Sequence, residues 1–263
     1  MELTILSDNH TLIDRYLLGE PAFSCYLSLK GQGVLLDTGY FGTFAQNAEA
    51  LKLPWRQAAA VVLSHSHNDH TRGLKAFFCE GPKPRLYAHP ALFRPVEDGG
   101  LPVGCPYSRE EMERYFDLHL SKEPVEIARD LFYLGEIPYV TDFEPPLAVG
   151  TCRHAPDFCP DDTALAYRGR EGVYVITGCS HRGIGNIIER AKAVTGQQRV
   201  LGVIGGFHLM ELNKRVEATI EYLKKQQIPC LCPCHCTALT VKAAMLEQMP
   251  VQEVGVGTKL VWE

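Results

Sequence analysis

Short apolar runs separated by polar turns fill the first quarter of the chain and predict strands. One run, at residues 58–63, ends abruptly in a polar segment rich in histidine. A buried strand of this kind delivers its polar residues to the end of a sheet, which is where open sheets present their chemistry. Strands are expected at residues 3–7, 25–29, 34–37 and 58–63, with a turn at 30–33 and a helix at 41–51.

The pattern loosens between residues 79 and 149, where prolines and aromatic residues are frequent and a single helix is predicted at 109–120. We interpret this stretch as a lid-like insertion within a single domain spanning residues 1–263. Strands and helices alternate after Asp162, which predicts sheets covered by helices. The later strands are expected at 164–167, 173–177, 200–204, 230–234 and 257–262, and the helices at 185–194, 214–226 and 239–248.

The charge balance and the lack of long apolar runs narrow the classes of partner. The chain has 26 Lys and Arg against 31 Asp and Glu, a net charge of −5, so no general positive field would hold a nucleic acid. Its longest apolar runs fall short of the ~18 residues of a membrane span, and its start lacks the pattern of a secretory signal. We therefore expect a cytoplasmic protein with a small-molecule substrate, and we interpret its ten cysteines as reduced thiols.

Four strand-like runs end in a turn that contains histidine, and this recurrence is the main chemical signal. The turns are LSHSHNDH with His65, His67, Asp69 and His70, TGCSH with His181, GGFH with His208, and PCHC with His235. Histidine beside carboxylate is the ligand set that Zn²⁺ prefers, and Fe, Mn or Ni can use it too. One metal ion could take three or four of these groups, and two ions could share all of them.

The spacing within the first turn favours two ions over one. In an extended segment His65 and His67 point to the same side and can bind one ion. Asp69 and His70 follow where the chain turns, and can face a second ion ~3.5–4 Å away, as in two-metal hydrolases. The alternatives are one structural ion or a surface histidine cluster.

The H-x-H-x-D-H motif after a strand makes the sequence resemble the metallo-β-lactamase superfamily. Within it, the chain is most similar to the branch of metal-dependent hydrolases related to dihydropterin ribofuranosyl-aminobenzene phosphate synthase. The segments that carry the resemblance are SDN at 7–9, LLDTG at 35–39, LSHSHNDH at 63–70, TGCSHRGIGN at 177–186, GGFHL at 205–209 and PCHCT at 233–237. The resemblance implies an α+β fold, an αββα four-layer sandwich with metals in a groove at one edge.

The resemblance also implies a ligand set. His65 and His67 would bind the first metal, and Asp69, His70 and His235 the second. Cys179 stands where many relatives have the aspartate that bridges both metals, so His181 or His208 is expected to substitute in the ligand shell. We expect Asp37 and Cys179 to support the ligands from behind. His181 could instead be a capping or loop residue.

Two departures from the branch concern the substrate. Relatives commonly have Glu-His-Gly-Leu-Ser near the start, whereas residues 20–24 here read EPAFS. If the missing histidine contacts substrate in relatives, a different substrate is expected here. Arg72 replaces a glycine after the metal motif and is a candidate for anion binding near the site.

Two further sets of residues leave alternatives open. His208 could bind metal, donate a proton to a leaving oxygen or stack under substrate, and a packed core histidine is the structural alternative. The cysteines at 230, 232, 234 and 236 suggest a structural zinc site, but along a strand they would span about 20 Å. We therefore expect them to pack as small hydrophobic residues while His235 faces the groove.

The sequence thus predicts a metal-dependent hydrolase in which an activated water attacks an ester-like or phosphoester substrate, such as one that contains a pterin or a phosphate. Asp69 and His208 are the candidate catalytic groups. The cofactor would be one or two divalent ions, most simply Zn. The rival hypotheses are a binding protein whose metal only braces the groove and an iron-dependent redox member of the same fold.

Overall fold

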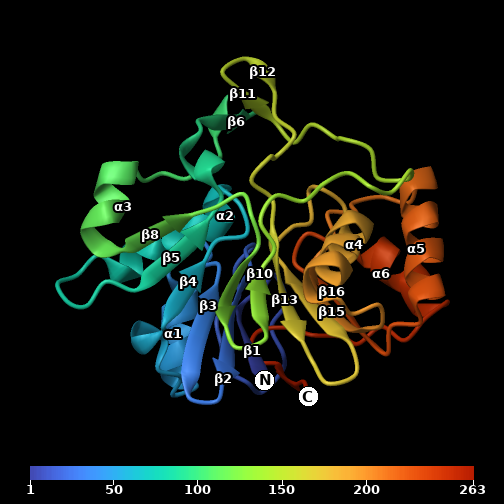
Figure 1. The fold of residues 1–263 in the computed structure, drawn as a ribbon, viewed down its shortest axis with the longest axis horizontal. Coiled ribbons are helices and arrows are strands. Elements are labelled where there is room, and N and C mark those ends of the chain that lie inside the picture. The colour runs from blue at the N-terminus through green and yellow to red at the C-terminus, as the bar shows by residue number, and fades with distance from the viewer.

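Two large sheets packed face to face form the centre of the molecule, and helices cover their outer faces (Figure 1). The computed structural model describes residues 1–263. The four layers confirm the predicted αββα sandwich. In spatial order, the seven-stranded sheet contains β17 (Lys259–Val261), β1 (Glu2–Ser7), β2 (Ser24–Leu29), β3 (Gln32–Leu36), β4 (Ala60–Val62), β5 (Arg85–Ala88) and β8 (Asp117–Leu120). The six-stranded sheet contains β16 (Cys230–Cys234), β15 (Val200–Gly206), β14 (Val173–Thr177), β13 (Ala164–Arg168), β10 (Leu131–Tyr133) and β9 (Val125–Ala128).

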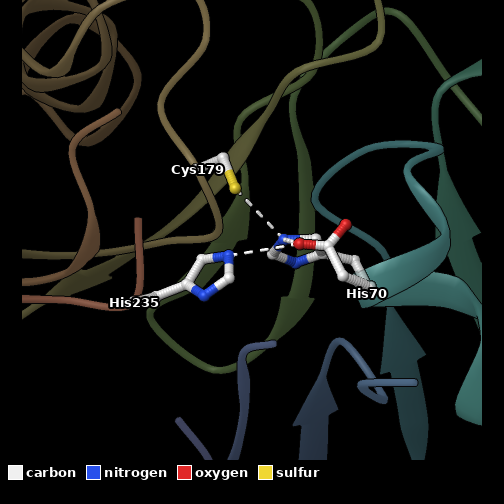
Figure 2. Close-up of side chains that lie close together, drawn as sticks. His70, Cys179 and His235 are labelled. Carbon is white, nitrogen blue, oxygen red and sulfur yellow. Dashed lines mark hydrogen bonds and ion pairs between the residues drawn. The ribbon is translucent and has the colours of Figure 1, made fainter. Parts of the chain in front are cut away.

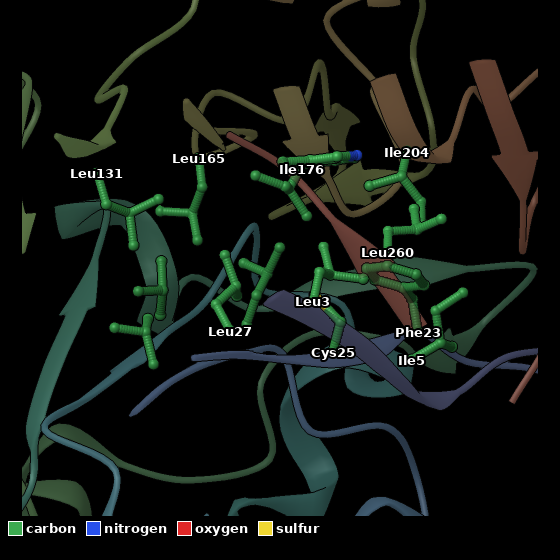
Figure 3. Close-up of a cluster of buried hydrophobic side chains, with 14 of the residues drawn as sticks. Leu3, Ile5, Phe23, Cys25, Leu27, Leu131, Leu165, Ile176, Ile204 and Leu260 are labelled. Carbon is green, nitrogen blue, oxygen red and sulfur yellow. The ribbon is translucent and has the colours of Figure 1, made fainter. Parts of the chain in front are cut away.

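The strands read as continuous apolar runs because both faces of each sheet are buried. In β1, Leu3 and Ile5 face the other sheet while Leu6 faces the outer helices. Figure 3 shows Leu3, Ile5 and Leu27 opposite Leu165 and Ile176 in the layer between the sheets. Burying a side chain of this size contributes about 1.5–3 kcal/mol, so the inter-sheet layer is a principal source of stability.

Each outer face has its own apolar layer. Helices α1 (Thr43–Ala50) and α3 (Arg109–Tyr115) cover the seven-stranded sheet. Helices α4 (Ile184–Thr195), α5 (Lys214–Gln226) and α6 (Leu239–Leu246) cover the six-stranded sheet. The short helix α2 (Asn68–Thr71) belongs to the histidine-rich segment after β4. No helix of the chain combines the length and the apolar character needed to cross a bilayer.

The predicted helix at 109–120 is wrong in its second half. Helix α3 begins at the N-cap Ser108, whose hydroxyl accepts the Glu111 N–H at 3.1 Å, and it ends at Tyr115. Phe116 is buried in an extended conformation, and β8 then pairs in parallel with β5. In β8 the polar side chains of Asp117 and His119 alternate with leucines, so a strand period replaces the helical one.

The segment 79–149 is divided among three sheets. β5 and β8 belong to the seven-stranded sheet, and β9 and β10 belong to the six-stranded one. Only a small four-stranded sheet stands apart, at the top of Figure 1. It consists of β12 (Ala155–Pro156), β11 (Thr151–Cys152), β6 (Val96–Asp98) and β7 (Leu101–Pro102). The part that stands apart from the two large sheets is therefore this small sheet and the chain that leads into it.

Candidate metal centre

The histidine-rich segment after β4 brings His65, His67, Asp69 and His70 to the carboxyl end of the strand. The rings of His65 and His67 lie 4.6 Å apart between centroids, and those of His65 and His70 lie 4.2 Å apart. Helix α2 begins at Asn68, so Asp69 and His70 occupy its first turn. The change from extended chain to helical turn separates the histidine pair from the Asp69–His70 pair.

The six-stranded sheet adds one histidine after each of three successive parallel strands. His181 follows β14, His208 follows β15 and His235 follows β16. Carboxyl ends of parallel strands share one edge, so all three arrive at the same place. His208 and His235 have positive φ angles of 47° and 46°, which turn the chain sharply at the strand ends.

These side chains fall into overlapping groups, and within each group the possible ligand atoms lie within 4.8 Å of one another. Around the first position, His65, His67 and His181 are linked in pairs: His65 shares one group with His67 and another with His181, and His67 shares a third with His181. The second is surrounded by Asp69, His70 and His235, and Asp69 Oδ2 lies 3.3 Å from Nε2 of each histidine. Figure 2 shows the imidazoles of His70 and His235 and the Cys179 sulfur directed at one small region.

Two cysteines lie among these groups. Cys179 belongs to the group with Asp69, His70 and His235 and also to a group with His65 and His181. Its sulfur is 3.1 Å from His70 Nε2, closer than the supporting position that the sequence suggests. Cys159 belongs to a group with His67 and His181, and sequence reasoning missed it. No pattern around Cys159 distinguishes it from the other cysteines.

The donor atoms fit divalent metal ions. Buried nitrogen atoms without any hydrogen-bond partner include Nε2 of His65, His67 and His235 and both ring nitrogens of His181. A buried polar atom without a partner is costly, and so many of them at one point are expected only if a ligand satisfies them. Imidazole, carboxylate and thiol groups together suit Zn²⁺ and its first-row neighbours.

The remaining atoms of several candidate ligands are held by hydrogen bonds. Asp37 Oδ2 lies 2.6 Å from His70 Nδ1 and accepts the Ser64 hydroxyl at 2.7 Å. The same hydroxyl lies 2.9 Å from His65 Nδ1. Nδ1 of both histidines is thereby occupied, which leaves their Nε2 atoms directed into the centre. Asp37 thus lies where the sequence places it, behind the ligands.

A second set of contacts comes from the N-terminal SDN segment. The Asp8 carboxylate accepts the His235 backbone N–H at 2.9 Å, and Asn9 Oδ1 lies 2.8 Å from His235 Nδ1. These contacts join residues more than 220 positions apart. Neither Asp8 nor Asn9 received a functional assignment from the sequence pattern, although a polar run directly after a buried strand is a usable signal.

Charge and burial set the protonation of the centre. Burial, with help from neighbouring imidazoles, lowers the pKa of His65 and of His181 well below the usual value, so both are neutral and able to bind a cation. Burial opposes the ionised form of Asp69, but His70 and His235 outweigh it and hold the Asp69 pKa well below its usual range. At His70 burial opposes the charged form, but the carboxylates of Asp69 and Asp37 outweigh burial and raise the pKa well above its usual value. The centre therefore offers neutral imidazoles at His65 and His181 and an imidazole at His70 that is paired with carboxylates.

A cavity of about 770 Å³ opens onto these groups. Its lining includes Val103 and residues 147–150, which come from the chain next to the small four-stranded sheet. His208 and Lys242 also line the cavity, and Lys242 is the one lysine or arginine among the lining residues. Arg72 lies outside this cavity: it is exposed, stands over the Phe41 ring and lines two neighbouring hollows.

The cysteines of β16 do not form a metal group with one another. Cys230 and Cys232 point to the same side of the strand, with sulfurs 3.7 Å apart, and Cys232 and Cys234 are buried in the layer between the sheets. His235 turns away into the groove. The alternation of side chains along a strand predicts this opposite orientation of the cysteines and His235. The candidate metal site is therefore the cluster of histidines, and not the cysteines of β16.

Comparison with known proteins agrees with this geometry. The family model of the metallo-beta-lactamase superfamily matches residues 20–146. The chain is 30% identical to a 7,8-dihydropterin-6-methyl-4-(beta-D-ribofuranosyl)-aminobenzene-5'-phosphate synthase of Methanocaldococcus jannaschii, over 82% of this chain and 79% of the relative. It is also 29% identical to an uncharacterised protein of the same archaeon, over 96% and 98% of the two chains.

A solved structure extends the likeness to the whole fold. Tm1679, described as a metal-dependent hydrolase of the beta-lactamase superfamily, superposes with a TM-score of 0.85 at 25% identity, and the match covers 100% of both chains. Fold, centre and sequence thus agree. The chain belongs to the metallo-beta-lactamase superfamily, as a member of the metal-dependent hydrolase type.

Proposed function

We propose that this protein hydrolyses an ester-like or phosphoester bond of a small anionic molecule at a centre of two divalent ions, with zinc as the resident metal. The observation that carries the proposal is the set of unpartnered imidazole nitrogens at the floor of the cavity. When bound, divalent ions supply Lewis-acid stabilisation of negative charge and activate water. The first ion would be held by His65, His67 and His181, and the second by Asp69, His70 and His235.

The protein's own acid and base groups complete the chemistry. Asp69 lines the cavity with an ionised carboxylate and can accept a proton from the attacking water. His208 also lines the cavity, and its Nδ1 has no partner in the protein. We assign His208 the transfer of a proton to the leaving oxygen, because it faces the open space where a substrate would bind.

Lys242 and the lid define the substrate. Lys242 lines the cavity, and its charge acts on the buried Asp8 carboxylate without a direct ion pair, so its ammonium group is available to a phosphate or carboxylate of the substrate. Val103, Leu147 and Val149 form an apolar wall that can cover a ring system and exclude water. The relative from Methanocaldococcus jannaschii is named for a compound with a dihydropterin and a phosphate group, which supports a substrate with a ring system and a phosphate here.

The proposal places the protein in the cytoplasm, where its ten free cysteines would stay reduced. The substrate would then be an intracellular small molecule.

Metal analysis and a substrate screen test the function together. The purified protein should carry one to two ions per chain, should lose turnover of generic phosphodiesters, esters or lactones on chelation, and should regain it with zinc. His181→Ala should lower both metal content and turnover. A protein that binds metal and is stabilised by ligands, yet turns over none of these compounds, would instead be a binding protein.

The assignment of Lys242 has its own test. Lys242→Ala should raise the KM for an anionic ester by about 10-fold or more while changing little for a neutral ester of the same shape, since a hydrogen bond to a charged group contributes roughly 1.5–3 kcal/mol. Lys225→Ala, on the exposed side of α5, is the matched control. Equal effects on both esters would remove Lys242 from substrate binding.

A further inference from the structure

We infer that the Cys179 sulfur is the ligand shared by both metal positions, where a carboxylate would otherwise bridge them. The inference rests on the proposed two-ion centre and concerns a residue to which no comparison assigns a function. Cys179 is the cysteine that belongs to groups on both sides, with His65 and His181 and with Asp69, His70 and His235. It is almost fully buried, so its sulfur faces the imidazoles and not the solvent.

The backbone around Cys179 holds it close to the histidine-rich segment. A Cβ atom added to the preceding Gly178 would lie 2.1 Å from Ser64 Oγ and 3.0 Å from Asp37 Oδ2. A Cβ atom on Gly206 would lie 2.7 Å from the Gly178 oxygen. Both glycines therefore permit an approach that any larger residue would block, and this approach brings the sulfur to 3.1 Å from His70 Nε2.

Unpartnered atoms on both sides point at the same region. Nε2 of His65, which is 1% exposed, and both ring nitrogens of His181, which is 4% exposed, have no partner on the first side. On the second side, Nε2 of His235 has no hydrogen-bond partner and lies 3.3 Å from the Asp69 carboxylate. The Cys179 sulfur lies among these atoms, in a position from which a thiolate could bind a cation on either side.

The other candidates for a shared ligand fit less well. Asp69 belongs to a group with His65 and His67, but Oδ2 already contacts His70 and His235, and no group joins Asp69 to His181. Cys159 belongs only to the first side, and its thiol donates to Asp161 Oδ1 at 3.4 Å. Cys236 belongs to no group, and its thiol donates to the Cys179 carbonyl oxygen at 3.6 Å.

A shared thiolate has a chemical consequence. Sulfur is a softer ligand than carboxylate oxygen, so the centre should favour zinc, iron and cobalt over manganese. Oxidation of the Cys179 thiol by a peroxide would form a sulfenic acid with release of water, and both metal positions would lose a ligand in one event.

Cobalt spectroscopy tests the inference without relying on turnover. Protein loaded with two Co²⁺ ions per chain should show a near-ultraviolet thiolate-to-cobalt charge-transfer band. Cys179→Ser and Cys179→Asp should lose the band, and Cys179→Asp should still bind two ions because a carboxylate can bridge. Cys159→Ser should keep the band, as should the control Cys79→Ser, which alters an exposed thiol.

The outcomes separate this inference from the proposed function. Two bound ions with no charge-transfer band in the wild-type protein would leave the two-ion centre intact and make Asp69 the shared ligand. A band that disappears in Cys159→Ser and persists in Cys179→Ser would overturn the inference as well. Failure to bind any ion would reject both proposals. X-ray absorption of the zinc-loaded wild-type protein, which needs no variant, should find a sulfur neighbour at both ions.

Discussion

The metal centre has an N-terminal half, formed by the segment 65–70 after β4, and a C-terminal half, formed by His181, His208 and His235. The two halves are supported in different ways. In the N-terminal half, the nearby Ser64 and Asp37 occupy Nδ1 of His65 and His70. In the C-terminal half, His181 has no partner on either ring nitrogen, and His235 depends on Asn9 from the other end of the chain. We infer that hydrogen bonds within the fold orient the ligands of the N-terminal half before metal binds. The ligands of the C-terminal half have fewer such bonds, so metal ions would do more to fix their orientation.

The largest expected effect is on the free energy of unfolding, when the buried ion pairs of Arg94 are removed. Arg94 pairs with Asp157 and Asp161, and Asp161 also accepts the Ser66 N–H between His65 and His67. Removing one partner of a buried ionic network costs about 3–5 kcal/mol, because the remaining charges stay buried. Denaturant unfolding of Arg94→Ala should show a loss of this size, compared with little change for the exposed Arg114→Ala. A loss below 1 kcal/mol would mean that the halves fold without these ion pairs.

The second prediction concerns a buried acid beneath the C-terminal half. Burial raises the pKa of Asp162 to about 8, one oxygen accepts the Arg182 N–H at 2.8 Å, and the other has no partner. Between about pH 4 and pH 8 the folded chain therefore holds a proton that the unfolded chain has released. The free energy of unfolding should fall as pH rises through this window and level off above it.

Asp162→Asn removes this dependence and keeps an acceptor for the Arg182 N–H. The variant should gain up to about 5 kcal/mol over the wild-type protein as the pH rises from 4 to 8, measured by chemical unfolding of the metal-free chains. Asp142→Asn, at an exposed position, should show no such trend. Parallel pH profiles for Asp162→Asn and the wild-type protein would contradict a neutral carboxyl at this position.

The third prediction tests the N-terminal support directly. Asp37 has a φ of 55°, a conformation that asparagine tolerates, so Asp37→Asn changes the charge without straining the backbone. Loss of the carboxylate behind His70 should weaken metal binding by about 10- to 100-fold, as is typical for such supporting groups. Titration with zinc against a competing chelator measures this. Asp14→Asn, an exposed aspartate with a φ of 58°, is the matched control.

The N-terminal half was also the more predictable from sequence, for the same physical reason. His65, His67, Asp69 and His70 are local, and the strand before them is apolar, so their convergence follows from chain geometry. The family model, which ends at residue 146, covers this half and none of the later histidines. The αββα layers were predictable because each sheet is buried on both faces.

The sequence predicts His181, His208 and His235 at the centre, but the contacts that support the C-terminal half resisted prediction because they are long-range. Nothing in the sequence brings Asn9 to His235 or Cys159 to His67, since these pairs meet only after the two sheets pack. Arg72 illustrates the converse. It follows His70 closely in the chain, yet it points out of α2 toward Phe41, while the distant Lys242 lines the cavity. Closeness in sequence therefore predicts that residues 65–70 meet at one point, but it does not predict which way the side chain of Arg72 points.

The smallest expected effect is at the single contact that supports His235. Asn9 is exposed, so solvent can replace part of its contact to His235 Nδ1, and Asn9→Ala should weaken binding of only the second ion, by about 10-fold or less. Asn9→Asp should keep or strengthen it, since a carboxylate is a better acceptor for an imidazole N–H. Stepwise zinc titration resolves the two ions. If Asn9→Ala weakens both equally, the two positions are coupled through a shared ligand and the difference between the halves is one of degree.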